Sequence, residues 1–121
     1  MASVADIISI SAPASAVAGA RVDIDVSVKN IGSVKRFIAL TGIYDSNLLS
    51  WETDYLSVPA GQTVVIGGYF TMPSKNVRVT VYSWWWDGGQ WVQDDTMTKD
   101  ISVGGLKPEF QLFGVGDYSK T

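Results

Sequence analysis

Residues 77 to 91 read VRVTVYSWWWDGGQW, and this stretch says most about the fold. Valines alternate with other residues, aromatic side chains then occupy both parities, and Asp-Gly-Gly interrupts the run before another tryptophan. Successive side chains of a strand point to opposite faces, and glycines supply the positive φ angles of a tight hairpin turn. The stretch therefore predicts a β-hairpin whose turn is centred on Gly88 and Gly89.

The two faces of this hairpin carry different side chains. The valines, Ser83 and Trp85 share one parity, which we expect to face the core. A small domain can bury one aromatic row but has little reason to display a second, so the outward row is a candidate contact surface. That row consists of Tyr82, Trp84, Trp86 and Trp91. The cross-strand pairs predicted by the turn are Trp86 with Trp91, Trp84 with Gln93, and Tyr82 with Asp95.

Composition limits the classes of protein that fit. The chain has 121 residues and 46% hydrophobic content, enough for one domain with a core. Its 9 basic and 12 acidic residues are scattered, which argues against a nucleic-acid surface, and no apolar run reaches the roughly 20 residues of a membrane span. The absence of Cys and His excludes disulfide frameworks, thiolate zinc sites and catalysis by Ser-His-Asp or Cys-His groups.

The first residues, MASVADIISIS, lack the basic residues and the uninterrupted apolar stretch of a secretory signal. With Met1 as the natural start, we expect the protein to be made in the cytosol without a signal peptide.

Short extended segments separated by turn signals make up most of the chain. The turn signals recur roughly every 8 to 15 residues, a spacing typical of an all-β sandwich or small barrel. About seven strands fit before residue 104. We therefore predict an immunoglobulin-like antiparallel β-sandwich over residues 1–103. The predicted strands are 4–11 with Ile8 and Ile10 on one face, 21–30 with its valines and Ile24 inward, 36–44, 48–58 as a single piece, 63–72, and the two hairpin arms.

Residues 104–121 form a C-terminal apolar extension. Their sequence, GGLKPEFQLFGVGDYSKT, is too apolar for a discarded tail. Two alternatives stay open: the segment folds back as an extra edge strand or cover, or it is an arm that docks on another subunit. Its candidate interface residues are Phe110, Leu112 and Phe113.

Acidic residues offer little chemistry. Asp94 and Asp95 are adjacent in a predicted strand and should point to opposite faces, so they cannot easily share one task. Solvated turn and edge charges explain these and the other aspartates more simply than Ca²⁺ ligation, and no two carboxylates are placed around a cleft as a glycosidase requires. We therefore expect no catalytic residue, no metal, no cofactor and no enzymatic activity. The aspartates considered as joint Ca²⁺ ligands are Asp45, Asp54, Asp87 and Asp100.

Several segments resemble the CARDB-like group of bacterial and archaeal adhesion-type domains. The matching features are the Ile-Ser-x-Pro opening at 10–13, Gly19 before an alternating strand, Asn-x-Gly at 30–32 and the Pro-Ala-Gly-Gln turn at 59–62. The resemblance covers roughly residues 5 to 103 and implies an immunoglobulin-like sandwich, which hosts many unrelated functions. CARDB-like domains are usually modules of long secreted proteins, whereas we expect this chain, with Met1 as its natural start, to stand alone without a signal.

A looser resemblance concerns the hairpin. A WxWDGxxWVxDDT pattern with a short aromatic tail looks like stand-alone Ig-like structural proteins of phages and viruses. The matching residues are Trp84, Trp86, Asp87, Gly88, Trp91, Val92, Asp94, Asp95 and Thr96. This resemblance implies a virion component such as a decoration, fibre or tail-associated protein.

These observations lead to two functional hypotheses. The first is a non-catalytic structural protein, most simply a virion component, that acts through contacts with itself or other structural subunits and uses the aromatic row and the apolar extension. The alternative is a carbohydrate- or cell-surface-binding module whose exposed rings stack on surface glycans. A fragment of an adhesin would instead lie at the extracellular surface. The plainer alternative for the row is packing against residues 48–58 or the C-terminal segment of the same chain.

Overall fold

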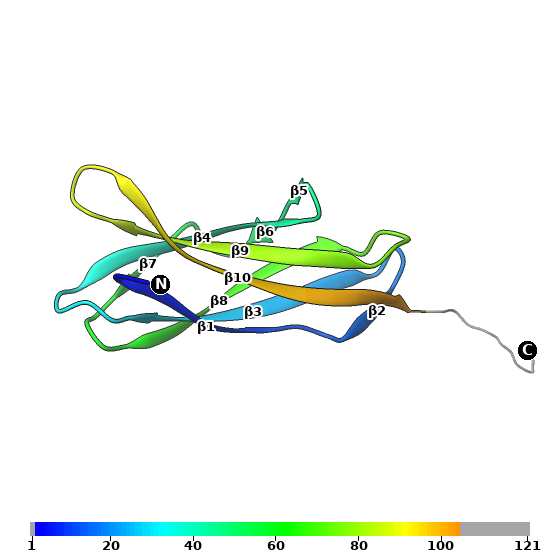
Figure 1. Cartoon of the computed structure of the whole chain (residues 1–121), viewed down its shortest axis with the longest axis horizontal. Coiled ribbons are helices and arrows are strands. Elements are labelled where there is room, and N and C mark those ends of the chain that lie inside the picture. Colours follow the sequence, from blue (N-terminus) through cyan, green and yellow to red (C-terminus); the bar gives the residue numbers. More distant parts are fainter. Residues whose placement is uncertain (1, 105–121) are drawn as a thin grey trace, which may run out of the picture.

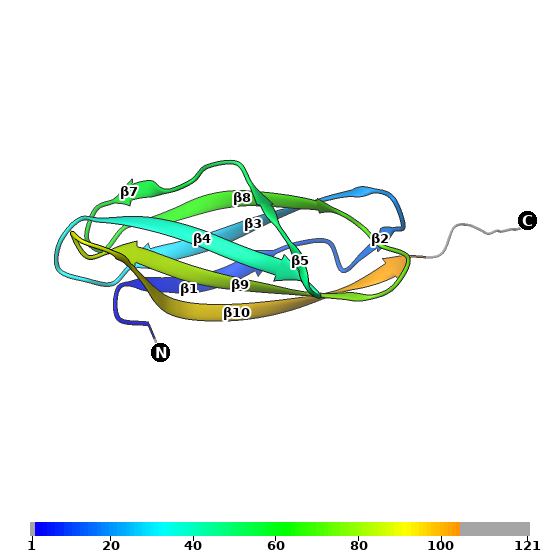
Figure 2. The same cartoon turned by 90° about the horizontal axis from the view of Figure 1, so that it is seen from above.

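The computed structural model describes residues 2–104, and they form two β-sheets that pack face to face (Figure 1, Figure 2). One sheet has the strand order β1-β3-β8-β6, and the other has the order β2-β10-β9-β4-β5, with β7 also paired to β4. The strands are β1 (Ala5–Ser11), β2 (Ser15–Val17), β3 (Arg21–Asn30), β4 (Arg36–Tyr44), β5 (Asn47–Leu48), β6 (Ser50–Trp51), β7 (Leu56–Val58), β8 (Thr63–Thr71), β9 (Val77–Trp86) and β10 (Trp91–Gly104). The predicted all-β sandwich is confirmed.

The described residues contain no helix that could cross a membrane. All but one of the strand pairings are antiparallel; the exception joins β2 to the end of β10.

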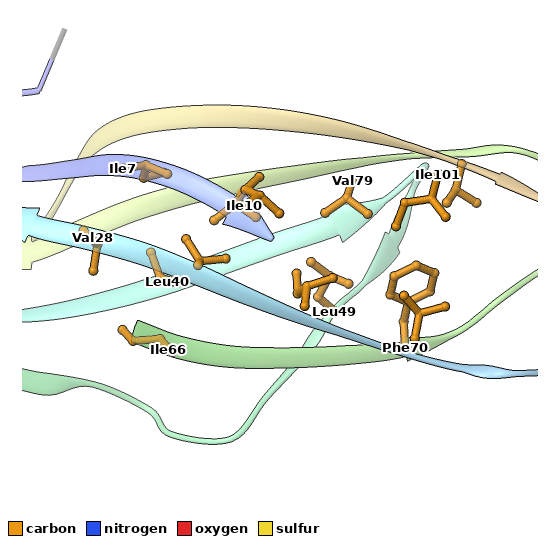
Figure 3. Packing of buried hydrophobic residues seen from close by; sticks show 14 of the residues in the cluster. Ile7, Ile10, Val28, Leu40, Leu49, Ile66, Phe70, Val79 and Ile101 are labelled. Carbon is orange, nitrogen blue, oxygen red and sulfur yellow. The ribbon is translucent and has the colours of Figure 1, made fainter. Parts of the chain in front are cut away.

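Alternation along β3 builds one wall of the core. Its valines and Ile24 are all buried, while the charged residues between them are largely exposed. The strand pairs with β8, where Ile66 and Phe70 are buried opposite Val26 and Val22. Each such side chain contributes about 1.5 to 3 kcal/mol when it leaves water. Figure 3 shows Val28, Ile66 and Phe70 pointing into the space between the sheets.

The inner face of β9 and β4 builds the opposite wall. Val77, Val79 and Val81 are buried, as their parity predicts, together with Ile38 and Leu40 of the neighbouring strand. Figure 3 shows Leu40 and Val79 within the same cluster as residues of the other sheet.

The single extended piece predicted for residues 48–58 is wrong. The segment is divided into β5, β6 and β7, and it passes from the six-stranded sheet to β8 and back. Close approach to two glycines permits this crossing: a Cβ at Gly42 would lie 2.7 Å from Leu49 Cδ1, and one at Gly68 would lie 2.9 Å from the Trp51 ring. The prediction failed because buried Leu49 and the Trp51 ring turn the chain across the edge of the sandwich.

The predicted sharing of one face by Ile8 and Ile10 is also wrong. The register of β1 against β3 shifts between Ile7 and Ser9, so Ile8 is an extra residue in the strand. A bulge of this kind resets the alternation of side chains. Ile7 and Ile10 are therefore buried, and Ile8 is half exposed.

The last described strand ends at Gly104, one residue beyond the predicted boundary of the sandwich. This end of β10 and the β9–β10 turn lie at opposite ends of the molecule (Figure 1, Figure 2). Residues 105–121 lie outside the described residues, and with them Phe110, Leu112 and Phe113.

Candidate interaction surface

The hairpin turn forms where the sequence predicts it. Trp86 pairs with Trp91, and a backbone hydrogen bond closes the turn: the Asp87 N–H donates to the Gln90 carbonyl at 3.1 Å. The Asp87 carboxylate accepts the N–H groups of Gly89 at 2.9 Å and Gln90 at 2.8 Å, and these bonds lower the pKa of Asp87. Only the first of the two central glycines adopts a positive φ, +103° at residue 88.

Strand parity places the aromatic row on the outer surface, as predicted. Trp84 lies opposite Gln93, and its Nε1 donates to the Thr41 hydroxyl at 2.8 Å across the outer face of the sheet. Trp84 and Trp86 are partly exposed, and Trp91 is 38% exposed. Trp85 points the other way and packs against the core, as its parity predicts.

Two further rings, which the sequence reasoning did not assign to the row, join it. The Tyr55 ring lies 5.3 Å from Phe37 and 6.1 Å from Trp91, and Trp91 lies 5.5 Å from Trp86, measured between ring centroids. Tyr55 is 51% exposed and Phe37 is 43% exposed. The packing of the row against residues 48–58, considered above as the plainer alternative, thus occurs through Tyr55 and leaves the rings open on one side. We call Phe37, Tyr55, Trp84, Trp86 and Trp91 the aromatic face.

A signal for Phe37 was present in the sequence. The segment 36–44 is apolar on both parities, a pattern expected of a strand whose outer face meets a partner. Tyr55 gave no such signal, because its position depends on the crossing of residues 48–58. Tyr82, the remaining member of the predicted row, lies further along β9, opposite Thr41 and Thr96.

Three hollows adjoin one another on the aromatic face, and the middle one shares bordering residues with each of the other two. The first is bordered by Lys35, Arg36, Phe37, Ser57, Trp86 and Gly88. The second is bordered by Phe37, Tyr55, Trp86 and Trp91. The third is bordered by Ala39, Thr41, Asp54, Tyr55, Trp84 and Trp91. One end of the face thus carries Lys35 and Arg36, with Asp87 near enough for the charge of Arg36 to help lower its pKa, and the other end carries Asp54, with the rings between them.

The predicted pairing of Tyr82 with Asp95 is wrong, because Tyr82 pairs with Thr96. The register shifts between Gln93 and Thr96, and Asp94 and Asp95 occupy the irregularity. A bulge redirects side chains that a regular strand would send to opposite faces.

Both carboxylates therefore share one task, contrary to the expectation from strand alternation. Asp94 accepts the backbone N–H groups of Ser3 at 2.7 Å, Val4 at 2.8 Å and Ala5 at 2.6 Å. Asp95 accepts the N–H of Ile7 at 2.9 Å. The pair binds the outer edge of β1, and the interpretation of these two residues as solvated edge charges is corrected by these contacts.

A buried hydroxyl extends this link between the sheets. Ser83 Oγ donates to the Ala5 carbonyl at 2.7 Å and accepts the Asp95 N–H at 2.9 Å. Asp6 lies beside the carboxylates: burial raises the pKa of its own carboxyl, and the hydrogen bond and charge of Asp95 together with the charge of Asp94 raise it further. Asp6, Asp94 and Asp95 form what we call the acidic cluster, and its hydrogen bonds, with those of Ser83, connect β1 to β9 and β10.

Within residues 2–104, no group of three or more His, Cys, Asp or Glu side chains could hold a metal ion. Asp45 and Asp100, two of the aspartates weighed as Ca²⁺ ligands, instead lie within ion-pair distance of Lys75 at 3.6 Å and Arg78 at 2.9 Å.

Comparison with known proteins places the fold. No protein-family model matches the chain, and no curated protein matches it. Among solved structures, the crystal structure of the CARDB domain of the PF1109 protein from Pyrococcus furiosus, described as a complex with di-metal ions, is similar with a TM-score of 0.62 and 17% identity, over 83% of this chain and 94% of that chain. The solution NMR structure of the same domain gives a TM-score of 0.54 and 16% identity, over 82% and 93%.

A second neighbour is the FixG-related protein from Vibrio parahaemolyticus, with a TM-score of 0.60 and 9% identity over 82% of this chain and 95% of that chain. None of these structures is of a phage or virus protein, so the looser resemblance of the hairpin stays a hypothesis. Likeness at such low identity concerns the fold and not the function. The protein has a β-sandwich fold similar to that of the CARDB domain.

Proposed function

We propose that the protein is a non-catalytic assembly module that binds another protein subunit through the aromatic face. The observation that carries this proposal is the exposure of three rings, Phe37, Tyr55 and Trp91, which lie together on the outer side of the six-stranded sheet. These three rings do not belong to the buried core cluster between the sheets, which consists mainly of aliphatic side chains together with Phe70 and Met72. Tyr, Trp and Phe are enriched in protein interfaces and dominate their binding energy.

The size of the face supports the same proposal. An aromatic side chain has roughly 150 to 250 Å² of surface, so the exposed fractions of these three rings amount to about 250 Å². With the partly exposed rings of Trp84 and Trp86, the face approaches the largest apolar patch of a typical monomer, about 300 to 600 Å², which is often functional.

Sedimentation velocity over a range of protein concentrations tests this function. We expect self-association, or binding to a partner subunit, that Trp86→Ala weakens at least tenfold. Tyr69→Ala serves as the matched control, because Tyr69 lies on β8 in the other sheet, beneath the Arg21 guanidinium. Equal effects of the two substitutions, or none from Trp86→Ala, contradict the proposal.

The setting that we propose is a virion, on the basis of the resemblance of residues 84–96 to hairpins of phage and virus structural proteins. Mass spectrometry of purified particles tests it. The protein should be present at a copy number comparable to other structural subunits, and its absence from the particles contradicts the setting but not the subunit contact.

A specific hollow favours the alternative, a glycan-binding module. The hollow beside Ala39 is walled by Tyr55, Trp84 and Trp91, and it has the Asp54 carboxylate and the Thr41 hydroxyl at its border. Sugars present apolar ring faces together with hydroxyl groups, which suit this combination of side chains. Titration with polysaccharides should then quench tryptophan fluorescence in the monomer, and Asp54→Ala should weaken the quenching. Unchanged fluorescence with every polysaccharide contradicts this alternative.

A further inference from the structure

Two unpaired charges lie at opposite ends of the aromatic face. Lys35 is exposed beside Phe37 and Trp86, and Asp54 is exposed beside Tyr55 and Trp84. The ion pairs of the described residues involve other side chains: Arg21 with Asp23, Lys75 with Asp45, and Arg78 with Asp100. Neither Lys35 nor Asp54 therefore has a partner of opposite charge within the described part of the chain.

This arrangement is self-complementary. In an interface with two-fold symmetry, residue i of one copy meets residue j of the other, and residue j of the first meets residue i of the second. We propose that the aromatic face binds the same face of a second copy across a two-fold axis that passes near Tyr55 and Trp91. Lys35 of each copy then faces Asp54 of the other. This inference rests on the proposed function and specifies the partner.

The position of the axis follows from the order of the hollows. The central hollow, between Phe37, Tyr55, Trp86 and Trp91, is shared with the basic hollow on one side and the acidic hollow on the other. Rotation about this centre exchanges the two ends and stacks rings on rings. Lys35 and Asp54 of opposite copies then lie together at both ends of the contact. A parallel alignment of the two faces would instead place Lys35 against Lys35 and Asp54 against Asp54. Charge complementarity of this kind sets the register of an interface.

The candidate interface residues Phe110, Leu112 and Phe113 of the same chain are poor occupants of the part of this face at Trp91. Gly104 and Trp91 are the two ends of β10, whose 14 residues span about 43 Å at roughly 3.3 Å per residue. Phe113 follows Gly104 by nine residues, and an extended chain of that length reaches at most about 32 Å. Phe110 and Leu112 reach less far. By this limit of chain length, none of the three candidate interface residues Phe110, Leu112 and Phe113 reaches Trp91 of its own chain, whereas Tyr118, fourteen residues after Gly104, lies within about 50 Å of extended chain.

Charge reversal tests the two-fold contact directly. Lys35→Glu and Asp54→Lys each create two like-charge contacts per dimer, so we expect each variant alone to associate about tenfold more weakly at low salt. An equimolar mixture of the two variants restores opposite charges at both ends. Its association should return to within about threefold of the unaltered protein. Asp25→Lys, at an exposed position on β3 of the other sheet, is the control, and its association should equal that of the unaltered protein.

The possible outcomes separate this inference from the proposed function. Rescue in the mixture and not in either variant alone supports the two-fold contact. Loss of association by Trp86→Ala, with both charge reversals silent, overturns the two-fold contact and leaves the assembly function standing. A strict monomer that shows glycan-dependent quenching overturns both. Loss of association on deletion of residues 106–121, with charge reversals again silent, assigns the contact to the C-terminal segment and overturns the inference.

Discussion

The hairpin carries two groups of residues that differ in the contacts they make: the rings Trp84, Trp86 and Trp91 of the aromatic face, and the carboxylate pair Asp94–Asp95. The two carboxylates accept four backbone N–H groups of the chain around β1. The rings of the aromatic face contact one another and remain open to solvent on one side. Groups that the fold already engages contribute to stability, and groups that it leaves open are available to a partner.

The comparison also separates two kinds of exposure. Asp94 and Asp95 are partly exposed, yet their oxygens are occupied, so their charge is not free for a ligand. Trp91 is exposed as well, but apolar ring surface in water is unfavourable by about 25 cal/mol per Å². Covering the rings with a partner would therefore lower the free energy of the system. We expect substitutions of the two carboxylates to affect the stability of the fold, and substitutions of the rings to affect association.

The largest effect is expected from Asp94→Ala. The substitution removes the acceptor of three N–H groups, two of them partly buried, and hydrogen bonds to a charged group contribute about 1.5 to 3 kcal/mol. We expect the free energy of unfolding, measured by urea denaturation, to fall by about 3 kcal/mol. Asp94→Asn keeps one carbonyl acceptor and should lose less. Asp25→Ala, on the outer face of β3, is the control. If Asp94→Ala lowers the free energy of unfolding no more than Asp25→Ala does, the structural role of Asp94 is contradicted.

A smaller effect is expected from Ser83→Ala. The buried hydroxyl bridges the Ala5 carbonyl and the Asp95 N–H, and its loss leaves both without that partner. We expect destabilisation by about 1 to 2 kcal/mol, measured by thermal unfolding. Ser27→Ala, at an outward position of β3, should change the stability by less than about 0.5 kcal/mol. A silent Ser83→Ala would show that the hydroxyl does not hold the two sheets together.

Regular alternation was predictable, and interruptions of it were not. The parity of β3 and of β9 follows directly from VDIDVSV and VRVTVYSWWW, because each residue of a regular strand changes face. Bulges in β1 and β10 break this rule without a composition signal: Ile8 and the pair Asp94–Asp95 look like ordinary strand residues. Their positions depend on contacts between strands that are distant in sequence.

The candidate surface was accordingly predicted in part. Trp84, Trp86 and Trp91 follow from the hairpin alone, since a local turn fixes their register. Tyr55 belongs to the same surface only because Leu49 and Trp51 carry the chain across the edge of the sandwich, a tertiary arrangement with no local signature.

The contribution of Asp6 to the free energy of unfolding should depend on pH with a sign opposite to that of a carboxylate in an ordinary ion pair. The pKa of Asp6 is raised above its ordinary value of 3.8, chiefly by burial, so the folded state binds the proton more tightly than the unfolded state. The free energy of unfolding then falls as the pH rises from about 3.8 through the raised pKa that Asp6 has in the folded protein. Asp6→Asn should raise the melting temperature at pH 7 and have no such advantage below pH 3.8. A difference that does not vary with pH contradicts this account.

The smallest effect on stability is expected from Trp91→Ala, measured at a concentration where the protein is monomeric. A fully buried tryptophan contributes about 3 to 5 kcal/mol over alanine, but Trp91 is 38% exposed and its ring contacts are those with Trp86 and Tyr55. We expect a loss below about 1 kcal/mol. Trp85→Ala is the matched control, because this neighbouring ring packs on the core, and it should cost at least about 2 kcal/mol. Equal losses at the two positions would mean that the aromatic face is part of the core after all, and then the reason to assign it to a partner disappears.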